Sequence, residues 1–176
     1  MKKYELTTET LQFAGRTLHR IKAVKDFDSI KAGEFGGWIE NEKNLSQDDN
    51  AWIYGDAMVF DNAKIFGNAE VYGNANVSGN ANVSDYAKVY GNAAIKGDAK
   101  VHDAVDYIVF KNFWSSGRYF TWTSSNNKWS VGCFYGTGEE LIKKAYADSE
   151  KSGREYERVV RYVESILADE KKEKSN

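Results

Sequence analysis

A six-residue unit repeats nine times without interruption between residues 50 and 103. Eight of the nine units begin with Asn or Asp and the seventh begins with Tyr86, and every unit has Ala second and Val or Ile fourth and ends with Gly or Asp. Such a short, fixed period is typical of a solenoid, in which each repeat stacks on its neighbours. Three hexads make one triangular coil of parallel strands, so the nine repeats predict three coils of 18 residues.

The unit also predicts which side chains form the core. Side chains of a strand alternate between its two faces, so each Val or Ile points inward and its two neighbours point outward. The Ala lies in the bend, where a larger side chain does not fit. The Gly or Asp and the following Asn supply the backbone angles of the corner. We therefore expect one stack of Ala, Val and Ile inside the coils.

Stretches such as Val71-Tyr72-Gly73-Asn74-Ala75 resemble the hexapeptide repeat of left-handed parallel β-helix proteins. This resemblance supplies the left hand, because the general rule for parallel connections favours the opposite one. Residues 20–103, including Gly36-Gly37-Trp38-Ile39, are also similar to YdcK-type hexapeptide-repeat proteins of bacteria, phages and prophages. The resemblance implies a trimer, but it implies no activity, because none is established for that family.

The chain divides into three parts and is mainly β. Residues 1–31 are expected to form an N-terminal capping segment, because the first coil of a solenoid has an open end. Residues 32–103 are the β-helix, with a degenerate coil at 32–49 and three regular coils at 50–103. Residues 104–176 predict a three-stranded aromatic meander and two helices, the first opened by a capping box at Thr137 and ended by Gly153.

The outward positions differ between the faces of the coils. Tyr54, Tyr72 and Tyr90 are 18 residues apart and predict a tyrosine ladder. The ladder either stabilises the coils through aromatic contacts or docks another segment or molecule. A flatter face is expected to pack between the protomers of the trimer, and its residues are Met58, Asn76, Ser78 and Ala94.

The C-terminal module supplies the other candidate binding residues. Trp, Tyr and Arg dominate binding hot spots. The candidates are Trp114, Arg118, Trp122 and Trp129. The alternative is that the Trp residues are core between the sheet and the helices.

Several classes of function are disfavoured by composition. The net charge of −2 predicts no general attraction to nucleic acid or to a membrane, and no apolar run is long enough to cross one. The lone Cys133 cannot form an intrachain disulfide, which fits a soluble cytoplasmic protein. Only His19 and His102 are present, too few for the zinc site of a γ-class carbonic anhydrase, so no metal, cofactor or catalytic residue is expected.

These observations favour a non-enzymatic, oligomeric binding protein of phage or prophage type. In its sharper form it is a counter-defence inhibitor that binds a host immune protein or complex. One alternative is sequestration of a small nucleotide between protomers. Another is a hexapeptide acyltransferase with His102 as a base oriented by Asp98 or Asp103. The last is a structural component of a phage.

Overall fold

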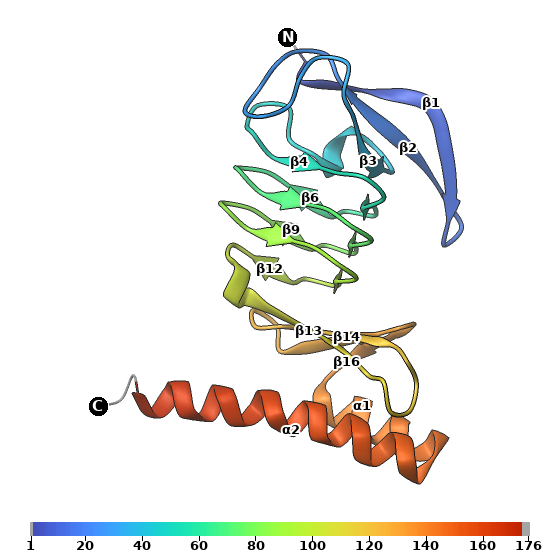
Figure 1. Cartoon of the computed structure of the whole chain (residues 1–176), viewed down its shortest axis with the longest axis vertical. Helices are drawn as coiled ribbons and strands as arrows, with labels where there is room; N and C mark the ends of the chain where they lie inside the picture. The colour runs from blue at the N-terminus through green and yellow to red at the C-terminus, as the bar shows by residue number, and fades with distance from the viewer. Residues whose placement is uncertain (1, 174–176) are drawn as a thin grey trace.

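The computed structural model describes residues 2–173. N-terminal strands, a parallel β-helix, a C-terminal sheet and two helices follow one another along the long axis of the molecule (Figure 1). The chain is therefore mainly β, as the repeat predicts.

The β-helix is built from three ladders of very short parallel strands. Residues 18 positions apart pair with each other, as Met58 does with Asn76 and Asn76 with Ala94. This register confirms the predicted coil length. The ladders consist of β4 (Trp52–Ile53), β7 (Glu70–Val71) and β10 (Lys88–Val89); β5 (Met58–Val59), β8 (Asn76–Val77) and β11 (Ala94–Ile95); and β6 (Lys64–Ile65), β9 (Asn82–Val83) and β12 (Lys100–Val101).

The repeat supplies the core of the β-helix. Its nine Ala residues are 0% exposed, and its nine Val or Ile residues are at most 1% exposed. They form one continuous hydrophobic cluster from coil to coil. The predicted inward positions are thus confirmed, and removal of their apolar surface from water is the main stabilising contribution.

In eight of the nine hexads the last position lies at a corner with positive φ, and the exception is Asp103, whose φ is −146°. Gly79 has a φ of 72°, and a Cβ there would lie 2.8 Å from the backbone nitrogen of Gly97 in the next coil. Asp61 and Asp85 adopt the same region, with φ of 59° and 57°. Asp tolerates this conformation better than most residues. Corner geometry therefore explains why the position is restricted to Gly and Asp.

The N-terminal hairpin extends one face of the β-helix. β1 (Tyr4–Phe13) pairs antiparallel with β2 (Arg16–Ala23), and β2 pairs antiparallel with β3 (Phe35–Ile39). β3 pairs in parallel with β5, so one sheet runs in the order β1-β2-β3-β5-β8-β11. A 3₁₀ helix, η1 (Glu42–Asn44), follows β3. The tip of the hairpin reaches along the outside of the coils (Figure 1).

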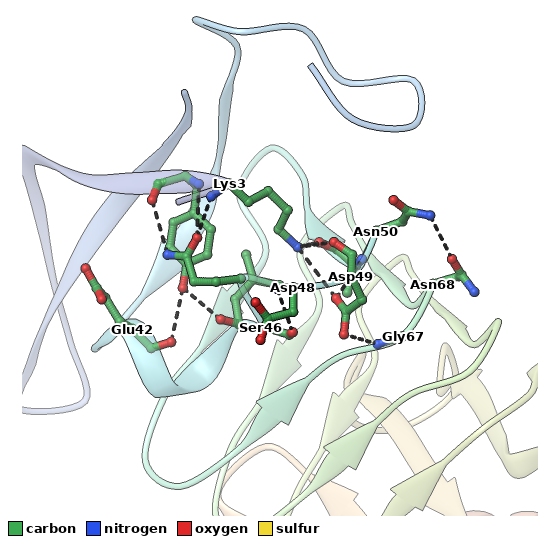
Figure 2. A network of polar contacts seen from close by, with 12 residues as sticks. Lys3, Glu42, Ser46, Asp48, Asp49, Asn50, Gly67 and Asn68 are labelled. Atoms are coloured by element: carbon green, nitrogen blue, oxygen red, sulfur yellow. Dashed lines mark hydrogen bonds and ion pairs between the residues drawn. The ribbon is translucent and has the colours of Figure 1, made fainter. Parts of the chain in front are cut away.

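A buried lysine closes the open end of the first coils (Figure 2). Lys3 is 1% exposed, and its Nζ donates hydrogen bonds to the backbone oxygens of Asp49 and Ala51, at 2.9 and 2.8 Å. The Asp49 carboxylate lies 3.6 Å from the same nitrogen. Burial lowers the pKa of Lys3 to about 8, against the opposing effect of Asp49. The ammonium group thus satisfies carbonyl oxygens that would otherwise be an open ladder edge.

The C-terminal sheet has four strands, one more than the sequence predicts. A 3₁₀ helix, η2 (Ala104–Asp106), leads into it. The expected third strand at 128–134 is split at Gly132, whose φ of 57° allows a tight turn. The strands are β13 (Tyr107–Lys111), β14 (Tyr119–Thr123), β15 (Lys128–Val131) and β16 (Phe134–Gly136), paired in chain order.

Two helices, α1 (Gly138–Asp148) and α2 (Glu150–Glu173), share a hydrophobic core with this sheet. The capping box at Thr137 is confirmed, since its side chain and that of Glu140 each accept a hydrogen bond from the other's backbone nitrogen. Gly153 lies inside α2, so the expectation that it ends the first helix was wrong. A Cβ at Gly153 would lie 2.2 Å from the ring of Tyr146, so this glycine allows close packing of the two helices.

Candidate functional site

The largest exposed aromatic side chains of the C-terminal module gather beside one groove. Phe113 is 72% exposed, Trp114 66% and Tyr162 56%. The groove has a volume of about 460 Å³ and lies between the end of β13 and the middle of α2. We call it the aromatic groove, and its lining residues are Phe110, Lys111, Asn112, Trp114, Glu155, Arg158, Val159 and Tyr162.

A buried asparagine holds the turn that presents these aromatic side chains. The Oδ1 atom of Asn112 accepts hydrogen bonds from the backbone nitrogens of Trp114 and Ser115, at 2.9 and 3.1 Å. Its Nδ2 donates to the Ser115 hydroxyl at 2.8 Å. Asn112 is 3% exposed, so the turn is anchored although Phe113 and Trp114 are not covered. The exposed rings are therefore displayed by a fixed turn.

Positive charge lies at the rim of the aromatic groove. The Lys111 ammonium lies 5.1 Å from the centre of the Phe113 ring and 5.4 Å from that of Tyr119. Within residues 2–173, no carboxylate forms an ion pair with Lys111, whereas Arg158 pairs with Glu155 at 2.7 Å. The groove thus combines exposed Trp and Tyr side chains, which are enriched in binding hot spots, with a lysine that has no ion-pair partner in the described part of the chain.

Of the candidate binding residues of the module, the structure leaves Trp114 and Arg118 exposed. Trp122 and Trp129 are only 3% and 2% exposed and belong to the core between the sheet and the helices. The indole of Trp122 donates to Asn127 Oδ1 at 2.9 Å, which satisfies its polar atom. These two Trp residues therefore present no contact surface. They are core because β14 and β15 turn them toward the helices.

Phe113 and Tyr162 were not among the binding residues predicted from the sequence. Phe113 precedes Trp114 and the turn residues Ser115-Ser116-Gly117, and two large aromatic residues beside a turn are a signal of exposure. Tyr162 is an exposed residue of the amphipathic helix α2, and the spacing of the apolar residues in that helix could have indicated its exposure. The sequence did not show that α2 lies close to β13, where the two elements line the groove.

The tyrosine ladder forms as predicted and continues into the C-terminal module. The rings of Tyr54 and Tyr72 lie 6.2 Å apart, and those of Tyr72 and Tyr90 stack at 5.6 Å. Tyr107 of β13 lies 6.4 Å from Tyr90 and donates a hydrogen bond to the backbone oxygen of Lys88 at 2.9 Å. The ladder therefore stabilises the coils and also docks the chain's own next segment.

The flatter face is partly covered by the chain itself. Met58 packs with residues of the β1–β2 hairpin, and Ser78 is 6% exposed. The backbone nitrogen of Ala94 donates to the Thr121 hydroxyl of the C-terminal sheet at 2.9 Å. Asn76 lies between Met58 and Ala94 in the ladder. The contact between protomers through these four residues stays a prediction, and it would have to accommodate the hairpin and the sheet.

His102 lies beside a serine and an aspartate of the preceding coil. Its Nδ1 is 2.8 Å from Ser84 Oγ and 3.0 Å from Asp85 Oδ2. Asp98 instead accepts a hydrogen bond from Asn126, and Asp103 accepts one from the backbone of Ala104. The expected orienting residues, Asp98 and Asp103, were therefore wrong. Ser84 and His102 are 18 residues apart, so the coil period could have indicated this pair.

Two searches of the described residues concern metal sites and membrane-spanning helices. Among the described residues, no group of three or more His, Cys, Asp or Glu side chains could hold a metal ion. In the same part of the chain, no helix is long and apolar enough to cross a membrane.

Comparison with known proteins gives one partial similarity. The chain matches no family model. Over 62 residues it is 39% identical to a protein of Escherichia coli (strain K12) described as the uncharacterized acetyltransferase YdcK. The matched segment covers 31% of this chain and 19% of that protein. The chain is therefore distantly similar to part of that protein, and it spans less than a fifth of its length.

Proposed function

We propose that this chain is a binding protein that docks a different protein through the aromatic groove. The observation that carries this proposal is the group of three exposed aromatic side chains, Phe113, Trp114 and Tyr162, beside one groove. Monomeric proteins rarely leave contiguous apolar patches exposed without a binding function. The fixed turn at Asn112 supports the proposal, because a pre-ordered contact loses little conformational entropy on binding.

The occupant of the groove is an amphipathic segment of another protein, with apolar anchors and an acidic side chain. An acidic residue would pair with Lys111, whose charge is not neutralised by the described part of the chain. A second copy of this chain fits less well. A two-fold contact brings identical patches together and would place the unpaired Lys111 of both copies in the same interface. A host immune protein or complex, as the sequence analysis expects of a counter-defence inhibitor, is the finer form of this proposal.

The test is a binding isotherm with a reconstituted partner. Proteins that the wild-type chain captures in its native host are first purified individually. The affinity of each one is then measured by titration against the wild-type chain, Trp114→Ala and Tyr86→Ala. Tyr86 is a matched control, because it is 76% exposed on the β-helix and lies outside the groove. Trp114→Ala should weaken binding by roughly thirtyfold or more, the loss typical of a hot-spot residue, whereas Tyr86→Ala should not. Equal affinities for all three proteins would refute the groove as the docking site.

A second candidate function is acyl transfer at His102. It is favoured by the contacts of Nδ1 with Ser84 and Asp85, which orient the ring, and by the description of the E. coli relative as an acetyltransferase. With Nδ1 held in this way, Nε2 would accept the proton of an attacking amine or hydroxyl. The test is thiol release from an acetyl thioester in the presence of candidate acceptor amines. Release that is lost in His102→Ala would support this function, and no release above background would dismiss it.

A further inference from the structure

β13 is an edge strand of the C-terminal sheet. The sheet runs in the order β13-β14-β15-β16, so β13 has a strand neighbour on one side only. Its sequence, Tyr107–Lys111, has no Pro and no charged residue before Lys111. Proline, charge and irregularity are the usual means by which proteins protect such an edge, because its free backbone groups can pair with another chain. The free edge of β13 is therefore a candidate contact surface.

The pairing register shows which backbone groups of β13 face this edge. The backbone nitrogen of Asn112 donates to the oxygen of Arg118, and that of Ser124 donates to the oxygen of Asp106, both at 2.9 Å. In an antiparallel pair, every second residue exchanges its hydrogen bonds with the partner strand. The even-numbered residues of β13 therefore bond to β14. The odd-numbered residues direct their N–H and C=O groups to the free edge, and they are Tyr107, Val109 and Lys111.

No other segment of the described chain occupies the free edge. Among residues 2–173, no backbone hydrogen bond from another segment reaches the outward groups of Tyr107, Val109 or Lys111. Each residue from 105 to 112 also lines one of three hollows beside the strand. An added strand would thus find unpaired donors and acceptors, and open space, along the whole of β13.

Two of the hollows lie between β13 and α2. The first is the aromatic groove, at the C-terminal end of β13. The second has a volume of about 510 Å³ and lies between the N-terminal end of β13 and the C-terminal half of α2. We call it the acidic groove, because its lining includes Asp106, Glu170 and Glu173 but no Lys or Arg. Its lining also includes Val105, which is 79% exposed and adds apolar surface.

The third hollow lies between β13 and the last coil. It has a volume of about 380 Å³, and we call it the tyrosine pocket because Tyr90, Tyr107 and Tyr119 line it. Val109 packs against the core of the β-helix, whereas Phe110 packs against the core shared with the helices. Side chains of a strand alternate in the same way. An added strand would therefore place successive side chains in the tyrosine pocket and in the grooves beside α2.

The surroundings of β13 favour a single extended segment over a second copy of this chain. The sheet lies between the last coil and the two helices (Figure 1), and all the side chains of β13 except Lys111 are buried or half-buried. The free edge is thus recessed between two walls. A second copy would present the same recessed edge, so the two edges could not meet closely.

The charge beside the free edge changes sign along its length. Lys111 lies at one end and has no ion-pair partner among residues 2–173. The carboxylates of Asp106, Glu170 and Glu173 lie at the other end, in the acidic groove. A complementary segment is therefore acidic where it passes Lys111, basic where it passes the acidic groove, and apolar between them.

We propose that the partner protein docks through an extended segment of this kind, which pairs with β13 and adds a fifth strand to the sheet. This inference rests on the proposed function, because it gives the bound form of the segment that enters the aromatic groove. The outward groups of Val109 and Lys111 form main-chain hydrogen bonds with the segment, and these bonds supply affinity. The hollows receive its alternate side chains, and these contacts supply specificity.

A proline at the free edge tests the strand pairing. Lys111→Pro removes an N–H group that faces the segment, but no hydrogen bond to β14, and proline is tolerated at such edge positions. Lys111→Ala is the matched control, because it loses the same charge but keeps the N–H group. The probe is the purified host protein whose affinity is reduced by Trp114→Ala. Lys111→Pro should bind it roughly tenfold more weakly than Lys111→Ala does, because an acceptor of the segment is left unpaired.

Amide hydrogen exchange of the wild-type chain, resolved by NMR, gives a second measurement that needs no variant. In the complex, the N–H groups of Val109 and Lys111 should exchange roughly tenfold or more slowly than in the free chain, because they become hydrogen-bonded. The N–H group of Ile108 is an internal control, since it faces β14 in both states and should change much less. If Lys111→Pro does not fold, the exchange measurement alone decides.

The outcomes separate this inference from the proposed function. Unchanged exchange at Val109 and Lys111, or equal affinities of Lys111→Pro and Lys111→Ala, would overturn strand addition. Docking in the aromatic groove would still stand, provided that Trp114→Ala weakens binding. Protection of Val109 and Lys111 by concentration of the chain alone would show a second copy at the edge and would also overturn the inference. Failure to find a host protein that depends on Trp114 would instead refute the proposed function.

Discussion

At the scale of single residues, the hexad was largely readable from the sequence because each of its positions has one physical role. The Ala and Val positions are buried, and the corner positions need positive φ, so neither kind depends on distant segments. The outward positions depend on what covers them. The protomer contact predicted at Met58 and Asn76 stays a prediction, but the sequence did not show that the hairpin packs on Met58 and that the C-terminal sheet borders the same face.

The corner glycines should differ in their tolerance of alanine. Gly55 and Gly79 both have positive φ, but a Cβ at Gly55 meets nothing within 4 Å, whereas one at Gly79 lies 2.8 Å from the next coil. Gly55→Ala should therefore lose only about 1–2 kcal/mol, from backbone strain. Gly79→Ala should lose more, because the adjacent coil must also shift. Urea unfolding measures both, and equal losses would show that the coil spacing adapts freely.

The Oδ1 atom of Asn76 is buried without a hydrogen-bond partner and should lower the stability of the chain. Asn76→Leu removes this atom, so the free energy of unfolding should rise by about 1 kcal/mol. Asn82→Leu is the matched control, since Asn82 has the same hexad position on β9 but no unsatisfied buried oxygen. Urea unfolding of both variants is the measurement. A loss of stability in Asn76→Leu, with none in Asn82→Leu, would show that Asn76 is satisfied in solution.

At the scale of elements, the two ends of the β-helix are closed by opposite chemistry. Each coil donates backbone N–H groups to the carbonyl oxygens of the next coil. The first coil therefore leaves acceptors open, and these are satisfied by Lys3 Nζ and Asn44 Nδ2. The last coil leaves donors open, and the hydroxyls of Thr121 and Ser125 accept from them. The sequence indicated that caps were needed. It did not identify the capping residues, because Lys3, Thr121 and Ser125 lie 25 to 48 positions from the backbone groups that they contact.

The Lys3 cap should make stability depend on pH. The pKa of Lys3 is lowered by burial from 10.5 to about 8, so between these values the unfolded chain binds more protons than the folded one. The free energy of unfolding should therefore rise with pH, by on the order of 1 kcal/mol between about pH 8 and 9.5. Above about pH 10 it should fall again, because burial raises the pKa of Tyr107 to about 12 and the unfolded tyrosine loses its proton first.

Urea unfolding of wild type and Lys3→Met at about pH 8 and 9.5 tests the cap. Lys3→Met should be less stable at both values, because the carbonyl oxygens of Asp49 and Ala51 lose their donor. Its stability should not rise with pH over this interval. A rise as large as that of wild type would show that another group is responsible.

At the scale of the whole molecule, the β-helix acts as a rigid spacer between a hairpin at one end and an aromatic module at the other (Figure 1). The hairpin tip and the C-terminal sheet both line one cleft on the flatter face of the β-helix, and the C-terminal module also carries the aromatic groove. The sequence indicated an aromatic C-terminal module, with Trp114, Trp122 and Trp129 among its candidate binding residues. It could not separate Trp114 from the buried Trp122 and Trp129, because that requires the position of the helices.

Native mass spectrometry of the chain purified from its native host tests most directly whether it acts by docking another protein. The account predicts a complex of fixed stoichiometry with a second protein, present for wild type and Tyr86→Ala and lost for Trp114→Ala. Assembly only with further copies of this chain, or a heterologous complex that Trp114→Ala leaves unchanged, would contradict it.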